Sequence, residues 1–448
     1  MSSPLRSLND YFRKLNDLLS SESWELSEEA AKLLSIGDAH VQMKFLQLEK
    51  AEDERRLFLN NIFDEIACLH LAVIYHLSKE HFENAFNTHV QAVQLFNKEI
   101  LQKEKDQNWF LPILYTLCTD LRLLARSADN KPSRLRDPEK SSCYEQSATY
   151  IMECYRTCVA DVRAEIHTSK KMAMLNLTNQ LFRVYFRINK LNLLKPLIRA
   201  IDNSGPLYQK FSMADKVTYK YYLGRKAMFD SDLSLSEESL SYAFRNCPSY
   251  CARNKRLILI YLVPVKMFLG HMPSVDLLKR YQLQQFATVV ESVKDGNLKK
   301  LDETLMENER FFVECGIFLM LEKLKIIAFR NLFKKVTRIY GSNQISYEAF
   351  MCAIRWLGIV DMDEDELECI LANLIVETAK DFEKNLVVEV ENFLCKISLN
   401  SMILFFHNLE KHFEGKKFAM KRNFKIPNPD AFRDLEIAKV FQSCCAED

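Results

Sequence analysis

The sequence predicts an all-α protein built as an α-solenoid, a stack of tetratricopeptide-like helical hairpins. Its 448 residues include only nine glycines and eleven prolines, too few for the many turns of an all-β protein of this length. Apolar residues recur at helical spacing along most of the chain. The apolar share of 48% is enough for a large core, divided into two or more packed units or one elongated stack.

The first predicted hairpin consists of two helices, each with its own apolar stripe, joined by a break of only a few residues. Such a short connection is typical of antiparallel neighbours. A third helix follows, and then the polar stretch 127–142, which contains two prolines and predicts a loop. The three helices are expected at about residues 57–77, 82–96 and 109–126.

After the loop, long helices continue in pairs, and each pair is expected to bury its apolar face against its neighbours. No strict repeated motif is present, so the likeness to a tetratricopeptide array is one of shape only. The predicted pairs are 143–166 with 169–189, 191–202 with 212–229, and 234–246 with 253–269.

The pattern changes after Gly341. A short extended piece at 345–347 precedes a helix over 347–357, and the acidic segment 361–366 then opens a helix that runs to about Val376. Acidic residues at a helix start oppose the positive end of its dipole. Asp363 and Glu366 have the spacing of a capping box, with Asp in place of Ser or Thr.

Composition excludes several classes of protein. The net charge of +1 gives no global field that would select a partner. Thirteen cysteines are scattered without a framework, and the first twenty residues contain no apolar signal region, so we expect reduced thiols in a cytosolic or nuclear protein. The longest uncharged apolar run, 257–265, is far shorter than the roughly 20 residues that span a bilayer, and no membrane segment is predicted.

Motifs for catalysis are lacking in the sequence. It has no Gly-x-Gly, no phosphate-binding loop, no Gly-x-Ser-x-Gly and no His-Glu-x-x-His. We therefore expect no enzyme and no cofactor. The pairs Cys154 with Cys158 and Cys247 with Cys251 have the loose spacing of a zinc half-site, but no histidine pair accompanies them. We interpret them as buried structural thiols and predict no metal site.

Basic clusters are the strongest functional signal. One cluster lies in residues 321–338 with a single acid, and positions 323, 330, 334 and 338 share roughly one helical phase; a second lies in 411–425, with phenylalanines between the charges. Such patches bind phosphates by releasing counterions. The alternative is a solvated helix face, or pairing with the acidic segment 361–368. The predicted nucleic-acid-binding residues are Lys323, Arg330, Lys334, Lys335, Arg338, Lys416, Lys417, Lys421 and Arg422.

A third basic stretch has no acid from Leu181 to Ile201, within the predicted solenoid. It forms either a basic groove for an acidic ligand or an ordinary charged surface. Its members are Arg183, Arg187, Lys190, Lys195 and Arg199.

The stretch from Leu319 to Ile375 resembles the PCI domain, which is shared by subunits of the proteasome lid, the COP9 signalosome and a translation-initiation complex. The resemblance implies helical repeats followed by a winged helix with a small β wing. It lies in Leu321-Glu322-Lys323-Leu324-Lys325, Arg330-Asn331-Leu332-Phe333-Lys334-Lys335-Val336, Tyr340, Ile345-Ser346, Ala349-Phe350, Glu366-Leu367-Glu368 and Ile370-Leu371-Ala372-Asn373-Leu374-Ile375.

Upstream stretches narrow the resemblance to the PCI subunit of the TREX-two nuclear mRNA-export complex. The likeness covers roughly residues 80–376 and does not extend to residues 1–50. The stretches are 189–193, 195–202, 217–230, 254–266 and 270–273.

This resemblance implies a role and a set of partners. Members of the family pair with a large GANP-type scaffold that also carries a PCI domain, and with a small acidic Dss/Sem-type peptide. The hetero-oligomer presents a face for RNA or DNA and couples transcription to mRNA export, in the nucleus and at nuclear pores, with some of the protein in the cytoplasm. The basic stretch 183–199 would then accept the acidic peptide. A subunit of a proteasome-lid or COP9-signalosome-type assembly is the alternative.

The end of the sequence departs from the family pattern. Relatives have a short wing hairpin directly after the last winged-helix helix, whereas residues 377–414 intervene here before wing-like sequence resumes at 415–429. Either the wing carries an insertion, or the sequence differs from the natural product, for example through a retained intron. The predicted domains are an N-terminal helical extension (1–50), the helical-repeat solenoid (51–318), the winged helix with its insertion (319–430) and a tail (431–448).

Overall fold

A computed structural model of the protein describes residues 5–47, 62–104, 106–130, 142–163, 165, 168–340, 345–359 and 361–382. The elements within these ranges are all helices or helical turns, and none of the described residues forms a strand. The chain divides into two compact units, Met1–Ile258 and Leu259–Asp448. The division falls inside one helix, α13 (Ala252–Phe268). The predicted all-α fold is confirmed.

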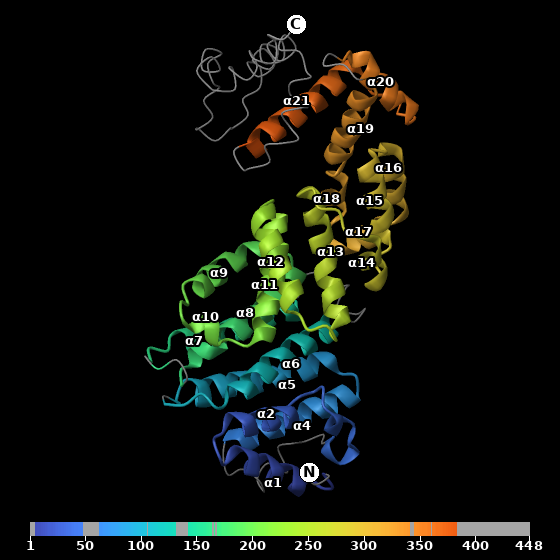
Figure 1. The fold of residues 1–448 in the computed structure, drawn as a ribbon. Helices are drawn as coiled ribbons and strands as arrows, with labels where there is room; N and C mark the ends of the chain where they lie inside the picture. The colour runs from blue at the N-terminus through green and yellow to red at the C-terminus, as the bar shows by residue number, and fades with distance from the viewer. Residues whose placement is uncertain are drawn as a thin grey trace. The chain divides into compact units, whose positions relative to one another are not determined.

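The first unit is a series of long helices in which neighbours along the chain lie side by side (Figure 1). Its α-helices are α1 (Leu8–Leu19), α2 (Trp24–Leu33), α4 (Ile62–Ser78), α5 (Phe82–Leu95), α6 (Leu111–Asp129), α7 (Cys143–Val159), α8 (Met174–Arg187), α9 (Leu194–Asp202), α10 (Leu207–Lys210), α11 (Met213–Phe229) and α12 (Leu233–Asn246). Short helical turns precede or extend several of them: η1 (Ala39–Gln42), η2 (Lys44–Leu46), η3 (Phe96–Leu101), η5 (Lys170–Ala173) and η6 (Leu191–Leu193).

Each long helix of this unit packs on the next, from α4 on α5 through α5 on α6, α6 on α7 and α7 on α8. Helix α8 then packs on α11, and α11 on α12. One continuous hydrophobic core joins the helices from α4 to α11, with fully buried rings that include Phe86, Phe110, Phe182 and Tyr219. This arrangement is the predicted solenoid of helical hairpins, because each apolar face is covered by the adjacent helix.

Helix α7 ends earlier than predicted, at Val159 instead of about residue 166. The reason is the carboxylate of Asp161, which accepts hydrogen bonds from the Lys170 amide at 2.7 Å and from the Ser169 hydroxyl at 2.9 Å. The same carboxylate pairs with Arg163 at 3.0 Å. These bonds offer the chain an alternative to further helical turns, a competition that propensity alone does not show.

The N-terminal segment 5–47, which the family resemblance does not cover, docks on the repeats. The Tyr11 hydroxyl donates to the Leu33 carbonyl at 2.9 Å, and the Ile36 amide donates to the carboxylate of Asp120 on α6 at 2.9 Å. The Nε2 atoms of His40 and His70 lie 3.0 Å apart, so one ring donates to the other. Buried polar contacts therefore fix this segment on α4 and α6.

Helices α11 and α12 approach each other closely at Gly224. A Cβ at this position would lie 2.6 Å from Cγ of Leu240 and 3.2 Å from its backbone nitrogen. The Gly224 carbonyl also accepts a hydrogen bond from the buried Ser236 hydroxyl at 2.8 Å. Only glycine allows this contact, because any side chain would push the two helices apart.

The second unit begins within α13 and contains eight further helices among its described residues. They are α14 (Val275–Arg280), α15 (Gln285–Asp295), α16 (Leu298–Glu307), α17 (Glu309–Cys315), α18 (Phe318–Glu322), α19 (Lys325–Tyr340), α20 (Tyr347–Trp356) and α21 (Glu364–Phe382). Helices α19, α20 and α21 pack against one another, as the helical part of a winged helix requires. Helix α21 runs past its predicted end near Val376, so residues 377–382 of the predicted insertion 377–414 are helical. The rest of that insertion, the predicted wing and the tail lie outside the described residues.

Local signals in this unit behave as the sequence predicts. The Asp363 carboxylate accepts from the Glu366 amide at 2.7 Å, which confirms the capping interaction at the start of α21. Residues 345 and 346 are non-helical and lead into α20, also as predicted. The predicted boundary at 318/319 between repeats and winged helix stays a prediction.

Replacing Gly224 by alanine should destabilise the first unit. Alanine gains up to about 1 kcal/mol in helix propensity, but the forced displacement of Leu240 and its backbone costs about 1–3 kcal/mol or more. We expect a lower urea midpoint for Gly224→Ala by circular dichroism. Gly37→Ala is the matched control, because its nearest neighbour would be Ser35 Oγ at 3.6 Å. A midpoint unchanged in both variants would contradict the close approach of α11 and α12.

Buried histidines should make the first unit acid-sensitive. His89 donates to the Leu117 carbonyl at 2.9 Å, and burial lowers its pKa to about 4. The unfolded chain binds this proton near pH 6.5, so its stabilisation is complete above pH 6.5 and is lost as the pH falls toward 4. Between pH 7 and pH 5 we expect the wild type to lose about 2 kcal/mol more than His89→Gln in urea unfolding.

The exposed His81 supplies the control, since His81→Gln should keep the wild-type pH dependence. Burial raises the pKa of Asp120 to about 7, so this carboxyl group contributes less stability as pH rises from about 4 to 7. That opposite trend is common to all three proteins and cancels in the comparison. Equal acid sensitivity of the wild type and His89→Gln would show that His89 is not buried as a neutral ring.

Candidate functional site

The basic stretch 183–199 occupies helix α8, the turn after it and helix α9. Arg183 and Arg187 lie one turn apart on α8, while Lys195 and Arg199 lie one turn apart on α9. Helix α9 buries one face, formed by residues 194, 197 and 201, against the core. Lys195 and Arg199 are therefore on its exposed side, as the amphipathic spacing requires.

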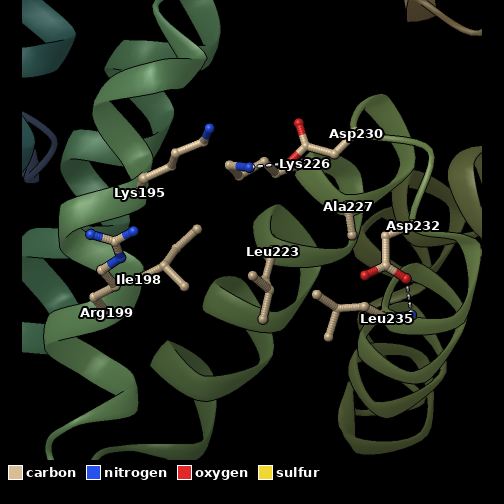
Figure 2. A pocket seen from close by; sticks show the side chains of 9 residues that line it. All are labelled: Lys195, Ile198, Arg199, Leu223, Lys226, Ala227, Asp230, Asp232 and Leu235. Carbon is tan, nitrogen blue, oxygen red and sulfur yellow. Dashed lines mark hydrogen bonds and ion pairs between the residues drawn. The ribbon is translucent and has the colours of Figure 1, made fainter. Parts of the chain in front are cut away.

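A pocket of about 210 Å³ opens beside α9 (Figure 2). Its lining comes from α9, α11 and α12, all in the first unit. The floor is apolar and the rim is charged. The lining residues are Lys195, Ile198, Arg199, Leu223, Lys226, Ala227, Asp230, Asp232 and Leu235. The volume is below the roughly 300–1,000 Å³ of small-molecule sites, so it suits one or two side chains of a partner.

Charges on the two sides of this pocket are not equally available. Asp230 pairs with the buried Lys226, and Asp232 accepts from the Leu235 amide at 3.0 Å to cap α12 (Figure 2). Lys195 and Arg199 form no ion pair with any described residue. The α9 side of the pocket thus offers two cations to a ligand, whereas the carboxylates opposite already serve the fold.

The five predicted residues do not form one row. Lys190 pairs with Glu145 of α7 at 2.7 Å, which separates the α9 pair from the α8 pair. Arg183 and Arg187 lie near α6 and α7 instead, where Arg183 acts electrostatically on Arg122 and Arg187 acts on Tyr144. Sequence analysis missed the α6 arginines because their neighbours come from a helix about sixty positions away.

The basic cluster 321–338 spans two helices. Lys323 follows the last residue of α18, while Arg330, Lys334, Lys335 and Arg338 lie on α19. The prediction that Lys323 shares one helical phase with the α19 residues is therefore wrong, because the helix breaks between them. Lys323, Arg330 and Arg338 are exposed and form no ion pair with a described residue, whereas Lys334 is half-buried.

Lys335 has a structural role at the end of α15. Its Nζ donates to the Asp295 carbonyl at 2.9 Å and lies 3.3 Å from the Asp295 carboxylate. The adjacent Asn331 donates to the Val293 carbonyl at 2.7 Å. These bonds satisfy carbonyls at the C-terminus of α15. The negative end of the helix dipole at this C-terminus also favours the positive charge of Lys335. Lys335 is consequently less available to phosphate than sequence alone predicts.

The remaining predicted contacts, Lys416, Lys417, Lys421 and Arg422, lie outside the described residues. Among the cysteines, Cys154, Cys158 and Cys247 are buried and Cys251 is half-buried. A hydrogen bond with Cys154 and burial raise the pKa of the Cys118 thiol, so Cys118 is a neutral thiol. Within the described ranges, no group of three or more histidine, cysteine or acidic side chains is placed to hold a metal ion.

No helix in the described part of the chain is both long and apolar enough to cross a membrane. Each unit thus has its own candidate binding surface. In the first unit it is the pocket with its α9 cations, and in the second it is the exposed cations of Lys323, after α18, and of α19.

Comparisons with known proteins agree with the fold. A Caenorhabditis elegans protein named PCI domain-containing protein 2 homolog is 56% identical over 377 residues, covering 83% of this chain and 91% of that protein. PCI domain-containing protein 2 of Xenopus laevis is 45% identical over 368 residues, covering 82% and 91%. A Schizosaccharomyces pombe protein named Protein CSN12 homolog is 28% identical over 394 residues, covering 82% and 91%. No protein-family model matches the sequence.

Proposed function

This chain belongs to the PCI domain-containing protein 2 family, and we propose that it is a non-catalytic scaffold subunit of a TREX-two-type nuclear mRNA-export complex. In this proposal it pairs with a GANP-type PCI scaffold and a small acidic Dss/Sem-type protein, and it contributes to nucleic-acid binding. The observation that carries the proposal is the similarity to PCI domain-containing protein 2 relatives over more than four-fifths of this chain and of theirs.

The pocket beside α9 supports the proposed docking of the acidic partner. Its apolar floor, which includes Ile198 and Leu235, accepts an aliphatic or aromatic side chain. Lys195 and Arg199 stand on one side and can pair with carboxylates next to that side chain. A segment that alternates acidic and apolar residues therefore matches both the floor and the open side of the rim.

The exposed cations of the second unit support the proposed nucleic-acid contact. Arg330 and Arg338 are two turns apart on α19, which is about 12 Å along the helix axis. Both guanidinium groups are free of ion pairs with described residues, so they can bind phosphate without breaking an internal contact. Lys323 adds a third charge just before this helix.

A second candidate is a subunit of a COP9-signalosome-type or proteasome-lid-type assembly. The observation that favours it is the similarity to the protein named Protein CSN12 homolog. The same docking surfaces would then contact other PCI subunits. Affinity purification from nuclei followed by mass spectrometry distinguishes the two, since recovery of signalosome or lid subunits without a GANP-type scaffold would overturn the export assignment.

Reversing the charge of the α9 side of the pocket should weaken binding of the acidic partner. For Lys195→Glu with Arg199→Glu, we expect the dissociation constant for a Dss/Sem-type protein to rise by about tenfold or more, because two attractive contacts become repulsive. Isothermal titration calorimetry measures the change.

Lys32→Glu with Lys44→Glu is the matched control, because both lysines are exposed in the N-terminal segment and the net charge changes equally. The control should bind within about twofold of the wild type. If both double variants lose affinity equally, the attraction is a long-range charge effect and the pocket is not the docking site.

Removing the two exposed arginines of α19 should weaken binding of single-stranded RNA and lower its salt dependence. Each lost phosphate contact reduces the slope of log K against log salt by about 0.7, so Arg330→Gln with Arg338→Gln should reduce it by about 1.4. Fluorescence anisotropy of the reconstituted complex with a labelled oligonucleotide, measured over a salt series, gives this slope.

A double variant on α14, Lys279→Gln with Arg280→Gln, removes the same charge from exposed positions of the same unit. It should keep the wild-type slope if the contact is local to α19. Lys335 is left intact in this design because its substitution would disturb the end of α15. An unchanged slope in the α19 variant would exclude these arginines from the nucleic-acid surface.

A further inference from the structure

Four arginines converge where α6, α7 and α8 pack together, away from the pocket beside α9. Arg122 and Arg126 lie one turn apart on α6, and Arg183 and Arg187 lie one turn apart on α8. Residues four apart in a helix share a face, and the three helices are in mutual contact. We call these four side chains the arginine quartet.

Electrostatic effects agree with the placement of these four side chains by their helices. Burial lowers the pKa of Arg122, and the nearby charges of Arg183 and Arg126 lower it further. Burial raises the pKa of Tyr144 on α7, and the charges of Arg122, Arg126 and Arg187 act against that rise. Tyr144 is thus a common neighbour of arginines from both helices.

Carboxylates next to the arginine quartet are already engaged. Asp129 accepts from the Cys143 amide at 2.9 Å and from the Tyr144 amide at 3.0 Å, so it caps the start of α7. Glu145 pairs with Lys190 at 2.7 Å. No arginine of the quartet forms an ion pair with a carboxylate in the described part of the chain. Among the described residues, the four positive charges of the patch are therefore not neutralised by ion pairs.

Arg122 is also fixed in orientation. Its Nε donates to Gln180 Oε1 at 2.9 Å, and Gln180 Nε2 donates to the Thr119 hydroxyl at 2.9 Å. The Thr119 hydroxyl in turn donates to the Tyr115 carbonyl at 2.7 Å. This chain of bonds engages one edge of the guanidinium and leaves its two terminal nitrogens for a ligand. Such preorganisation lowers the entropic cost of binding.

We propose that the arginine quartet binds a compact oligophosphate, a small molecule that carries several phosphate groups on one skeleton. All four cations are arginines, whose planar fork donates two parallel hydrogen bonds to a phosphate. Neighbouring arginines are about 6 Å apart along each helix and the packed axes about 8–10 Å apart. Closely spaced phosphates match this pattern better than one anion does. The inference does not rest on the proposed function.

Calorimetric titration of the full-length protein with inositol hexakisphosphate at physiological salt tests the proposal. We expect one saturable site with a dissociation constant of about micromolar order. Arg126→Gln with Arg187→Gln, both exposed, should weaken binding by about tenfold or more without affecting folding. Lys195→Gln with Arg199→Gln removes the same charge beside the pocket and should remain within about twofold of the wild type.

Arg122→Lys examines the geometry, because it keeps the charge but removes the fork, and it should weaken binding by several-fold. Inorganic triphosphate should compete with the inositol phosphate, whereas orthophosphate at the same concentration should not. The proposal is overturned by the absence of a saturable site or by equal weakening in both double variants. It is also overturned if the Arg126→Gln with Arg187→Gln variant binds single-stranded RNA more weakly than the wild type does but binds oligophosphates equally well.

Discussion

Every helix of the first unit depends on its neighbours to cover an apolar face, and this constraint governs the rest of the structure. A single amphipathic hairpin leaves its apolar side in water, so stability comes from contacts between successive helices. One of these contacts requires Gly224, because α11 and α12 meet there with no room for a side chain. Aromatic rings also form such contacts between neighbouring helices. The rings of Phe182 on α8 and Tyr219 on α11 stack with their centroids 5.7 Å apart.

The same constraint directs charge outward to the helix edges. Because the inward faces are apolar, arginine and lysine gather on the outer sides of α6, α8 and α9 in the first unit and of α19 in the second. Cations that the fold uses, such as Lys226 and Lys335, have partners close by. Those without a described partner, such as Arg199 and Arg330, mark the surfaces proposed for ligands. Only the ion pairs of the folded chain distinguish cations with a structural role from those available to a ligand, because both kinds have similar neighbours in the sequence.

A few buried polar groups join the N-terminal segment to the repeats. Two contacts replace the hydrogen bonds that these groups would form with water. They are the contact between His40 and His70 and the bond from the Ile36 amide to Asp120. Burial disfavours the charged forms of His70 and Asp120, so the contacts of this junction depend on pH. The charged outer faces of the helices and the titratable junction thus have the same cause, which is a core made mainly of apolar side chains.

The sequence by itself determined the helical class, most helix spans, the absence of strong catalytic motifs and the family, because these depend on local periodicity and on ordered residue matches. It also placed Lys195 and Arg199 on an exposed face, since amphipathic spacing is local. Tertiary structure alone decided that Lys190 is engaged by Glu145, that Lys335 closes the end of α15, and that Arg122 and Arg126 join Arg183 and Arg187. These outcomes depend on which distant helices become neighbours, and hydrophobic burial fixes that choice without leaving a local signal in the charged residues.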